Sequence, residues 1–446
     1  MSANDPLKNW LESHEIDEVE ALVPDMAGVA RGKFMPAGTF ATQGGMKLPA
    51  SVFIQTVTGD YAEEKIVGSL DADLDAVPDL DTLRVVPWAR EPSACVIHDC
   101  FFPDGKPVEI APRQLLRRVL ALYSAQGWRP FAAPEVEFYL VQRNIDPDYP
   151  LEPPVGRSGR QESVRSPFSM DAIDEFEPLI DDIYDFCEAQ RLMVDNLVHE
   201  AGAAQLEINF LHGDPLALSD QVFMFKRIVR EVAMRHGIHA TFMSKPMQKE
   251  PGSSMHWHIS VTEESRNANL FSADDGSETA EFRYFIGGLQ RYLPELHLLC
   301  APYVNSYRRI ARYMSAPINL QWGYDNRTVG LRVPRSAPVG RRVENRLAGA
   351  DANPYLAVAA TLAAGYLGLV EKLEPGKPES GNAYKHPLEL PRNLDVALSR
   401  LEQSQAARQV LGEDFVTVYA AIKHREFERF FEVISPWERE HLLLSV

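Results

Sequence analysis

Acidic and histidine side chains alternate inside segments whose other residues are apolar. Glu135 and Glu137 stand two residues apart, and so do His256 and His258. Side chains two apart along a β-strand point to the same face. An ionised carboxylate within an apolar strand costs several kcal/mol unless a cation or a hydrogen-bond donor compensates it. The spacing therefore indicates that a positive group, such as a divalent metal, lies against these acids.

Two more pairs of polar residues follow the same pattern. Glu200 and Glu207 flank the small-residue turn 201–204, which could fold two short strands so that both acids face one place. Glu344 and Arg346 alternate in the same way. Such a set holds five carboxylates, at most two imidazoles and no thiolate. It favours oxygen-seeking ions such as Mg²⁺ or Mn²⁺ over structural zinc.

Arginines are concentrated in the part of the chain that follows these acids. They include Arg308, Arg309, Arg312, Arg327, Arg332, Arg341, Arg342 and Arg346. Guanidinium groups bind carboxylate and phosphate oxygens. Together with divalent metals they indicate phosphoryl transfer, in which cations neutralise charge on the transferred group. The alternative is that the acid and histidine pairs are exposed polar strand faces and that the arginines form surface ion pairs.

Several other catalytic devices are absent from the sequence. It contains no GxxxxGK[ST] phosphate loop, no strand-linked GxGxxG, no HExxH and no GxSxG. The net charge of −18 is spread along the chain, which argues against a nucleic-acid partner. The longest nearly apolar stretch, 356–370, is shorter than a membrane span and is expected to be a buried helix. Four cysteines without a CxxC pair, and no signal-like segment after Met1, lead us to expect a cytoplasmic protein without disulfides.

The elements that must position these residues divide the 446-residue chain into a β-rich first part and a mixed second part. The expected early strands are 19–23, 29–34, 51–58, 83–88 and 94–101. We place the boundary after residue 105, which gives domains 1–105 and 106–446. The second part is expected to contain a helix from Pro112 to Gly127, strands 131–141, 254–261 and 319–333, a surface loop 146–167, a helix capped by Ser219 or Asp220, and helices from Asn353 onward. Strands followed by helices indicate an α+β fold.

Six segments resemble glutamine synthetases, in the same order along nearly the whole chain. They are 133–139, 199–207, 252–258, 305–309, then 326–327 with 331–334, and 342–346 followed by 352–355. The resemblance implies an N-terminal β-grasp domain and a catalytic domain of antiparallel strands and helices. It also implies a homo-oligomer of two stacked hexameric rings, with active sites between neighbouring subunits.

The resemblance also implies a role for each matching residue. Glu137, Glu200 and Glu207 would hold one metal, and Glu135, His256 and Glu344 another, with two or three Mg²⁺ or Mn²⁺ ions in each active site. Gly252, His256, Arg309 and Arg346 would bind glutamate. His258, Ser260, Arg327, Arg332 and Arg342 would contact ATP or the γ-glutamyl phosphate intermediate. Arg309, Arg327 and Glu344 would take part most directly in the reaction.

Two positions depart from the ammonia-using members of that family. Those members carry a Glu six residues after the arginine that corresponds to Arg309, where this chain has Ser315. They also carry an ammonium-binding Asp in an N-terminal loop, whereas the corresponding segment 47–53 contains no acid. A small cation needs close anionic partners to replace its hydration. The departures therefore predict weak ammonium binding and room for a larger amine.

We expect the chain to be an ATP-dependent ligase that joins the glutamate γ-carboxylate to a primary amine, most simply a polyamine. The resemblance extends to the branch that glutamylates polyamines and monoamines. Three alternatives stay open: a γ-glutamylmonoamide synthetase, an ammonia-using glutamine synthetase in which Asp60, Glu63 or Glu64 supplies the missing charge, and an inactive ring that serves as a scaffold or sensor. The amine itself could contact Tyr61, Glu63, Trp257 or Tyr313.

Overall fold

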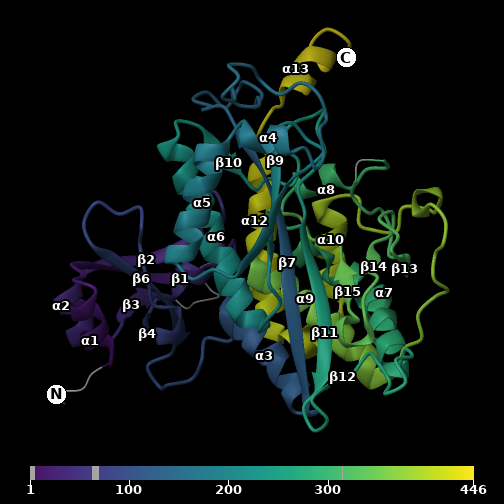
Figure 1. Ribbon diagram of the computed structural model, residues 1–446, viewed down its shortest axis with the longest axis horizontal. Coiled ribbons are helices and arrows are strands. Elements are labelled where there is room, and N and C mark those ends of the chain that lie inside the picture. The colour runs from purple at the N-terminus through teal and green to yellow at the C-terminus, as the bar shows by residue number, and fades with distance from the viewer. Residues whose placement is uncertain (1–5, 63–69, 314) are drawn as a thin grey trace.

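The computed structural model of this chain describes residues 6–62, 70–313 and 315–446, and it places two β-sheets side by side with helices between and around them (Figure 1). Glu63 and Glu64, named above as possible charge donors, lie outside the described residues. The predicted α+β class is confirmed. The division after residue 105 falls between the last strand of the first sheet and the helix that follows it, and it stays a prediction.

The first sheet is six-stranded in the part of the chain that the structure describes, with the order β2-β1-β6-β4-β3 and β5 paired to β6. Its elements are α1 Pro6–Ser13, β1 Glu18–Pro24, β2 Ala30–Pro36, α2 Ala37–Gln43, β3 Met46–Pro49, η1 Ala50–Phe53, β4 Asp73–Pro78, η3 Leu80–Thr82, β5 Arg84–Val85 and β6 Ser93–Phe101. β1 runs parallel to β6, and the other pairs are antiparallel. The strand expected over 51–58 is wrong, because this segment begins with the 3-10 helix η1.

The second sheet carries the residues singled out above. It is nine-stranded in the described part of the chain, with the order β13-β14-β15-β11-β7-β9-β8, and β10 and β12 pair with β7 and β11. The strands are β7 Trp128–Val141, β8 Val194–His199, β9 Gln205–Phe210, β10 His239–Thr241, β11 Met255–Glu263, β12 Ala268–Asn269, β13 Trp322–Tyr324, β14 Leu331–Val333 and β15 Val343–Asn345. Only β13 and β14 pair in parallel among these described strands. The long strands β7 and β11 run through its centre (Figure 1).

Register brings the predicted residues together. Glu135 on β7 lies opposite His256 on β11, and Glu137 lies opposite Glu207 on β9. His258 on β11 lies opposite Glu344 on β15. The four strands therefore bring these residues to one face of the sheet. The alternating pattern predicted a shared face within each strand, and the register shows that the strands converge.

Helices cover the opposite face of β7. The helices that follow the first sheet are α3 Pro112–Ser124, α4 Met170–Asp174, α5 Glu177–Ala189, α6 Pro215–Arg235, α7 Ala280–Cys300, α8 Ser306–Arg309, α9 Pro354–Glu371, α10 Leu394–Gln403, α11 Gln405–Leu411, α12 Glu413–Phe431 and α13 Pro436–Leu442, with 3-10 turns η4 Pro338–Gly340 and η5 Ala383–Lys385. Phe138 packs edge-on against Phe225 of α6, with ring centroids 5.9 Å apart. Because side chains alternate along β7, Glu135 and Glu137 point away from these helices.

Two helix predictions have different outcomes. The apolar stretch around 356–370 forms α9, which is long and apolar enough to cross a membrane by length and composition, yet 83% of that window is buried inside the protein. This agrees with the prediction of a buried helix. The expected cap at Ser219 or Asp220 is wrong: α6 begins at Pro215, and Asp214 caps it by accepting hydrogen bonds from the amides of Leu216 and Ala217.

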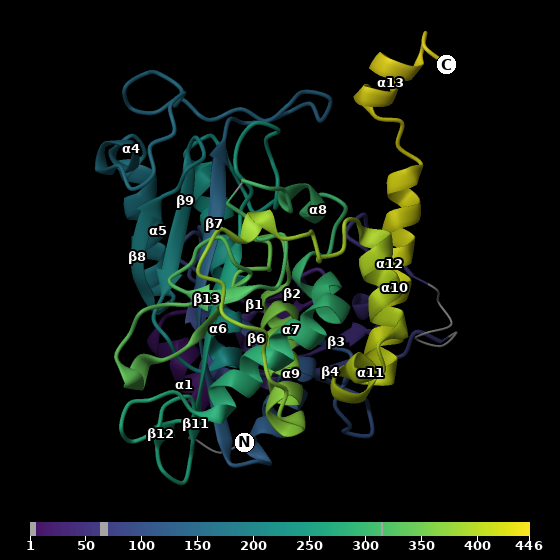
Figure 2. The ribbon, with the colours of Figure 1, turned by 90° about the vertical axis from the view of Figure 1, so that its right-hand side faces the viewer.

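The C-terminal helices form a column at one side of the molecule. After α12 the chain continues to α13, which projects beyond the body of the protein (Figures 1 and 2). No residue of α13 is buried.

Candidate active site

A cluster of carboxylates and imidazoles occupies the open face of the second sheet. Glu137, Glu200 and Glu207 each offer a carboxylate oxygen, and these atoms all lie within 4.8 Å of one another. Glu135 meets the same criterion in two further groups, with Glu207 and His256 and with His258 and Glu344. Glu200 reaches the cluster because the turn between β8 and β9 reverses the chain directly after it. The predicted acids are thus close neighbours.

The grouping differs in detail from the expected ligand sets. The set Glu137, Glu200 and Glu207 is present as expected. The second expected set was Glu135, His256 and Glu344. In the structure these residues are divided between two groups that share Glu135. One group contains Glu207 and His256, and the other contains His258 and Glu344. His256 Nδ1 lies 3.3 Å from Glu135 Oε2 and 3.7 Å from Glu344 Oε1. His256 therefore remains within reach of both acids.

The acids around Glu137 repel one another in a buried place. Burial raises the pKa of Glu137 to about 8, and the charge of Glu200 adds to this rise. Burial also raises the pKa of Glu207 well above its usual value, assisted by the charges of Glu135, Glu137 and Glu200. A divalent cation among these oxygens would offset both effects and let all of the carboxylates ionise.

The residues fit such a cation in a second respect. His256 is 4% exposed, and its Nε2 atom is buried without a hydrogen-bond partner among the described residues. A buried ring nitrogen without a partner is costly unless something binds it. Carboxylate oxygens with a single imidazole form a donor set that suits Mg²⁺ or Mn²⁺.

The other side of the cluster is compensated by cations of the protein itself. Glu344 is fully buried, its Oε2 accepts a hydrogen bond of 2.7 Å from Arg332, and its Oε1 contacts Arg346. Although burial opposes ionisation, the charges of Arg346 and His258 lower the pKa of Glu344 to about 2. Glu344 is therefore held as a carboxylate.

His258 links this cluster to an adjoining cavity. Its Nε2 atom lies 2.8 Å from Glu135 Oε1, and Arg342 Nε donates to its Nδ1 at 3.2 Å. The cavity has a volume of about 440 Å³, and its lining includes Phe131, Phe210, His258, Ser260, Asn269 and Arg342. Aromatic, apolar and polar groups of this kind suit a nucleoside.

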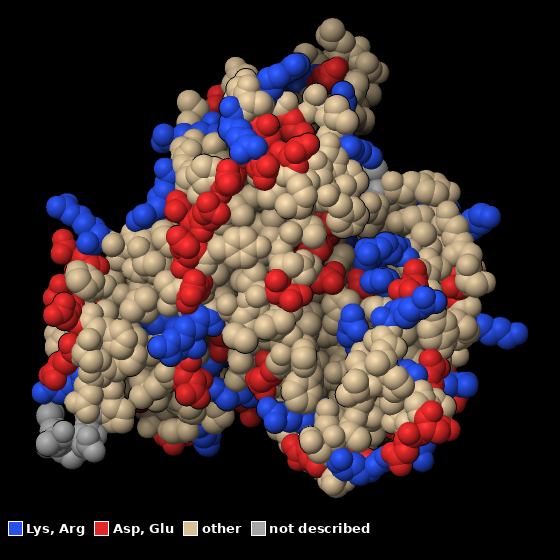
Figure 3. Space-filling model, viewed as in Figure 1, with Lys and Arg blue, Asp and Glu red and all other residues tan. Residues whose placement is uncertain are grey.

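The arginines predicted to bind ATP do not all line this cavity. Arg332 binds Glu344 and lies 3.2 Å from Asp325, so it faces the carboxylate cluster instead. Arg327 is exposed, and its charge partly offsets the burial that raises the pKa of Glu200. Acidic and basic side chains meet near β13 to β15, right of the centre in Figure 3. Arg332 thus contacts an acid of the cluster, and Arg327 is near enough for its charge to act on Glu200.

Gly252, Arg309 and Arg346 lie together on the other flank of the acids. Arg309 is 2% exposed, donates to Ser254 Oγ at 3.1 Å and contacts the carbonyl of Leu347. A Cβ added at Gly252 would approach the Arg309 side chain to 2.4 Å. Glycine at this position therefore leaves the space that the methylene carbons of Arg309 occupy.

Several residues that support the site were not predicted. Glu162 accepts hydrogen bonds from the amide of Ala204 at 2.7 Å and from His199 Nε2 at 3.0 Å, and Glu250 accepts one from the amide of Ala203 at 3.1 Å. Both acids therefore fix the turn that carries Glu200. Glu162 stands in the predicted surface loop 146–167, where local spacing gives no signal of this long-range contact.

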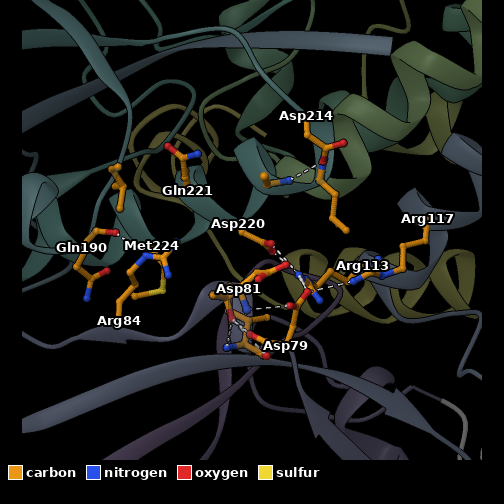
Figure 4. Close-up of a pocket in the computed structure, with 15 residues that line it drawn as sticks. Asp79, Asp81, Arg84, Arg113, Arg117, Gln190, Asp214, Asp220, Gln221 and Met224 are labelled. Carbon is orange, nitrogen blue, oxygen red and sulfur yellow. Dashed lines mark hydrogen bonds and ion pairs between the residues drawn. The ribbon is translucent and has the colours of Figure 1, made fainter. Parts of the chain in front are cut away.

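A separate cavity of about 320 Å³ lies between the first sheet and α6, and it contains none of the predicted site residues (Figure 4). Arg113 crosses its wall and pairs at 2.8 Å with Asp79, Asp99 and Asp220. Because every one of these acids is engaged, the cluster has a structural role and joins the first sheet to α3 and α6.

The residues proposed for the amine have different surroundings. Trp257 is fully buried in the core, and Tyr61 is exposed beside α12. Tyr313 is 67% exposed on the loop after Arg309, and Ser315 stands two residues further along the same loop. Among the described aromatic candidates, Tyr313 therefore stands nearest in the chain to Arg309, the arginine predicted to bind glutamate.

Comparison with known proteins gives one family. The sequence model described as "Glutamine synthetase, catalytic domain" matches residues 109–442. The chain is 34% identical over 446 residues to "Gamma-glutamylputrescine synthetase PuuA" of Escherichia coli (strain K12), covering 98% of this chain and 94% of that protein. It is 32% identical to "Glutamate--isopropylamine ligase" of Pseudomonas sp, covering 97% and 96%. It is 34% identical to a "Glutamine synthetase" of Pyrococcus abyssi, covering 95% and 92%.

Solved structures give the same result. The structure described as "Apo GmaS without ligand" superposes with a TM-score of 0.84 at 28% identity, covering 98% of this chain and 99% of that chain. The structure described as "GmaS/ADP complex-Conformation 1" superposes with a TM-score of 0.83 over the same coverage.

Proposed function

Because the chain belongs to the glutamine synthetase family and is an ATP-dependent carboxylate–amine ligase, we propose that it joins the γ-carboxylate of glutamate to a primary organic amine. The products are a γ-glutamylamide, ADP and phosphate. A polyamine is the amine we favour. Two relatives support an organic amine, since their names specify putrescine and isopropylamine.

We assign the two flanks of the carboxylate cluster to the two larger substrates. ATP would occupy the cavity lined by His258, Ser260 and Arg342, with its phosphates directed toward the acids. Glutamate would lie on the other flank, against Arg309 and Arg346. The acids between these flanks then lie where the γ-phosphate meets the γ-carboxylate.

Two metal sites are assigned to this cluster. Glu137, Glu200 and Glu207 would hold one ion, and Glu135, His256 and Glu344 would hold the other. Mg²⁺ or Mn²⁺ bound there would neutralise charge on the phosphate groups. The raised pKa values of Glu137 and Glu207 and the unpartnered His256 Nε2 support this assignment.

The reaction would have two steps. An oxygen of the glutamate γ-carboxylate attacks the γ-phosphorus of ATP, ADP leaves, and γ-glutamyl phosphate forms. The amine nitrogen then attacks the acyl carbon, phosphate leaves, and the nitrogen loses one proton. Arg327 and Arg332 would stabilise the negative charge of the transferred phosphoryl group. Arg309 would hold glutamate in line for the attack.

The observation that carries the choice of an organic amine is the chemistry of the loop after Arg309. Residues 310–318 contain no acid, and Ser315 stands where ammonia-using members carry Glu. An ammonium ion bound there would lose hydration without gaining an anionic partner. An organic amine needs less compensation from charge, because its hydrocarbon part can pack against apolar surface.

The test is a substrate comparison. Purified protein with ATP, Mg²⁺ and glutamate would be offered ammonia, putrescine, spermidine, spermine, ethanolamine and butylamine in parallel, with ADP release and product mass read together. We expect γ-glutamylamides of organic amines, with a kcat/KM at least tenfold above that for ammonia. Ammonia exceeding every organic amine would make the chain a glutamine synthetase, and no ADP with any amine would indicate an inactive scaffold.

We further propose that the protein works in the cytoplasm as a homo-oligomer of two hexameric rings. Its four cysteines are buried and free, which fits a reducing compartment. The projecting C-terminal segment exposes large apolar side chains, among them Phe431, Trp437 and Leu444. Exposed apolar surface of this kind is typical of a protein interface.

A further inference from the structure

The loop after Arg309 carries two residues in a strained backbone conformation. Tyr313 and Ser315 both have φ near +60°, a left-handed conformation that non-glycine residues seldom adopt. Such strain persists only where surrounding contacts maintain it, and it is concentrated at ligand clamps and active sites. The contacts that maintain this conformation therefore indicate which part of the loop has a function.

Those contacts lead to the turn η5. Arg312 Nη2 donates to the carbonyl of His386 at 3.1 Å, and Arg312 Nη1 contacts the carbonyl of Tyr384. The ring of Tyr313 lies on that of Tyr384, with centroids 5.2 Å apart and planes inclined by 52°. The loop is thus pinned to η5 through both a guanidinium group and an aromatic pair.

The turn η5 is itself held by hydrogen bonds to Asn319 and to Thr328, the residue that follows Arg327. Asn319 Nδ2 donates to the carbonyl of Ala383 at 2.8 Å, and the amide of Ala383 donates to Thr328 Oγ1 at 2.9 Å, directly after Arg327. Burial raises the pKa of Tyr384, and the nearby charges of Arg346 and Arg309 oppose that rise. The two arginines predicted to bind glutamate are thus among the charges that act on Tyr384.

The two tyrosines differ in how much of each ring is available. Tyr384 is 6% exposed and forms a fixed base, whereas Tyr313 is 67% exposed and leaves most of its ring open. Aromatic rings bury large apolar areas, and their faces also attract cations. A ring at this position attracts any ammonium group by its face, but only an amine with a hydrocarbon chain also gains packing against its apolar surface.

We propose that Tyr313, supported by Tyr384, is the wall against which the hydrocarbon part of the amine substrate packs, so that the enzyme selects alkylamines and diamines by their methylene chain. This inference rests on the proposed function, because it concerns the amine of that same reaction. It makes Tyr313 a specificity residue and Tyr384 its positioning residue.

The test is a chain-length series in kcat/KM with ammonia, methylamine, ethylamine, propylamine, butylamine and putrescine. In the unmodified protein we expect kcat/KM to rise about two- to fourfold with each methylene of the alkylamines, as apolar burial predicts. Tyr313→Ala should flatten this slope and lower kcat/KM for butylamine about tenfold, with a much smaller loss of kcat/KM for ammonia. Tyr313→Phe should keep the slope.

Tyr184→Ala is the matched control, because Tyr184 is a partly exposed tyrosine on the distant outer helix α5. It should leave the whole series unchanged. An unchanged slope in Tyr313→Ala, or an equal loss for ammonia and butylamine, would overturn the aromatic wall while leaving the amine ligase intact. If the unmodified protein uses ammonia alone, the proposed function fails first, and the wall fails with it.

Discussion

Among single residues, Glu344 shows most clearly how the site divides its charge. This carboxylate is fully buried, yet it is held ionised between Arg332 and Arg346. Glu137 and Glu207 belong to the same cluster, form no ion pair with a cation among the described residues, and have raised pKa values. The protein's own cations therefore offset much of the charge of Glu344, whereas the acids around Glu137 depend more strongly on a bound ion.

Glu344→Gln tests the neutralised flank with little change of shape. The substitution removes the negative charge between two arginines and a histidine, so we expect kcat to fall at least a hundredfold while the oligomer stays intact. ADP release and native mass would be measured together. Glu374→Gln is the control, because Glu374 forms an exposed ion pair with Arg283 at 2.5 Å. Activity of Glu344→Gln within tenfold of the unmodified protein would show that the metal assignment of Glu344 is wrong.

At the scale of elements, strand periodicity gave reliable predictions. The alternation in 131–141 and 254–261 predicted β7, β11 and the face that their acids share, because side-chain direction in a strand depends on position alone. Convergence of the four strands was a hypothesis until the register was known, since pairing between distant segments leaves no local pattern.

Local rules failed where a tertiary contact decided the outcome. The helix cap was expected at Ser219 or Asp220, but Asp214 supplies it, and Asp220 instead accepts hydrogen bonds from Arg113 inside α6. The segment 51–58 is apolar enough for a strand, yet η1 forms there, where the amide of Ser51 donates to Asp71. Partners 20 or more residues away cannot be identified from spacing.

The helix α7 carries a buried histidine that makes stability depend on pH. His297 is fully buried, and neither ring nitrogen has a hydrogen-bond partner in the described parts of the chain. Burial, with the charges of Arg309 and Arg400, lowers the pKa of His297 to about 3. The unfolded chain has an ordinary histidine pKa of about 6.5. Between the folded and unfolded pKa values, His297 is therefore protonated in the unfolded chain and neutral in the folded protein. Stability therefore falls as the pH drops from 6.5 toward 3.

His297→Phe should remove this sensitivity to acid. At pH 5 the histidine costs the folded state about 2 kcal/mol relative to neutral pH, so the variant should gain about that much on the unmodified protein between pH 7.5 and pH 5. Urea unfolding at the two pH values gives the comparison. His14→Phe, which replaces an exposed histidine just after α1, should show no such gain. An equal acid loss in His297→Phe and in the unmodified protein would contradict the argument.

In the whole molecule, one arginine on α3 joins the first sheet to the helix α6. Arg113 is 3% exposed in its side chain and pairs with Asp79 and Asp99 of the first sheet region and with Asp220 of α6. Removing a buried partner leaves an uncompensated charge, which costs about 3 to 5 kcal/mol. Arg113→Met should therefore lower the unfolding midpoint strongly. Arg117→Met should lower it much less, because Arg117 is 41% exposed. An equal decrease of the unfolding midpoint in the two variants would contradict the larger contribution expected from the buried arginine.

The C-terminal segment exposes large apolar side chains that do not pack on the rest of the described chain. Residues 433–446 follow α12 and include α13, whose start is fixed by a capping box between Ser435 and Glu438. The segment is thus ordered, yet Val433, Ile434 and Trp437 are about 60% exposed or more, and Leu444 is 94% exposed. An ordered apolar arm without a surface of its own to cover is expected to pack on another copy of the chain.

Deleting residues 433–446 tests this role directly. If the arm joins the two predicted rings, the full chain should have the mass of a dodecamer, and the truncated chain should have half that mass and still bind ATP. Trp437→Lys should weaken the same joint, because it places a charge in an apolar contact. Glu440→Gln, a neighbouring change on α13 that alters charge without altering apolar surface, should leave the mass unchanged. Light scattering at several concentrations would distinguish the dodecamer from the particle of half its mass. A truncated chain that keeps the full mass would show that residues 433–446 do not form the contact between the rings.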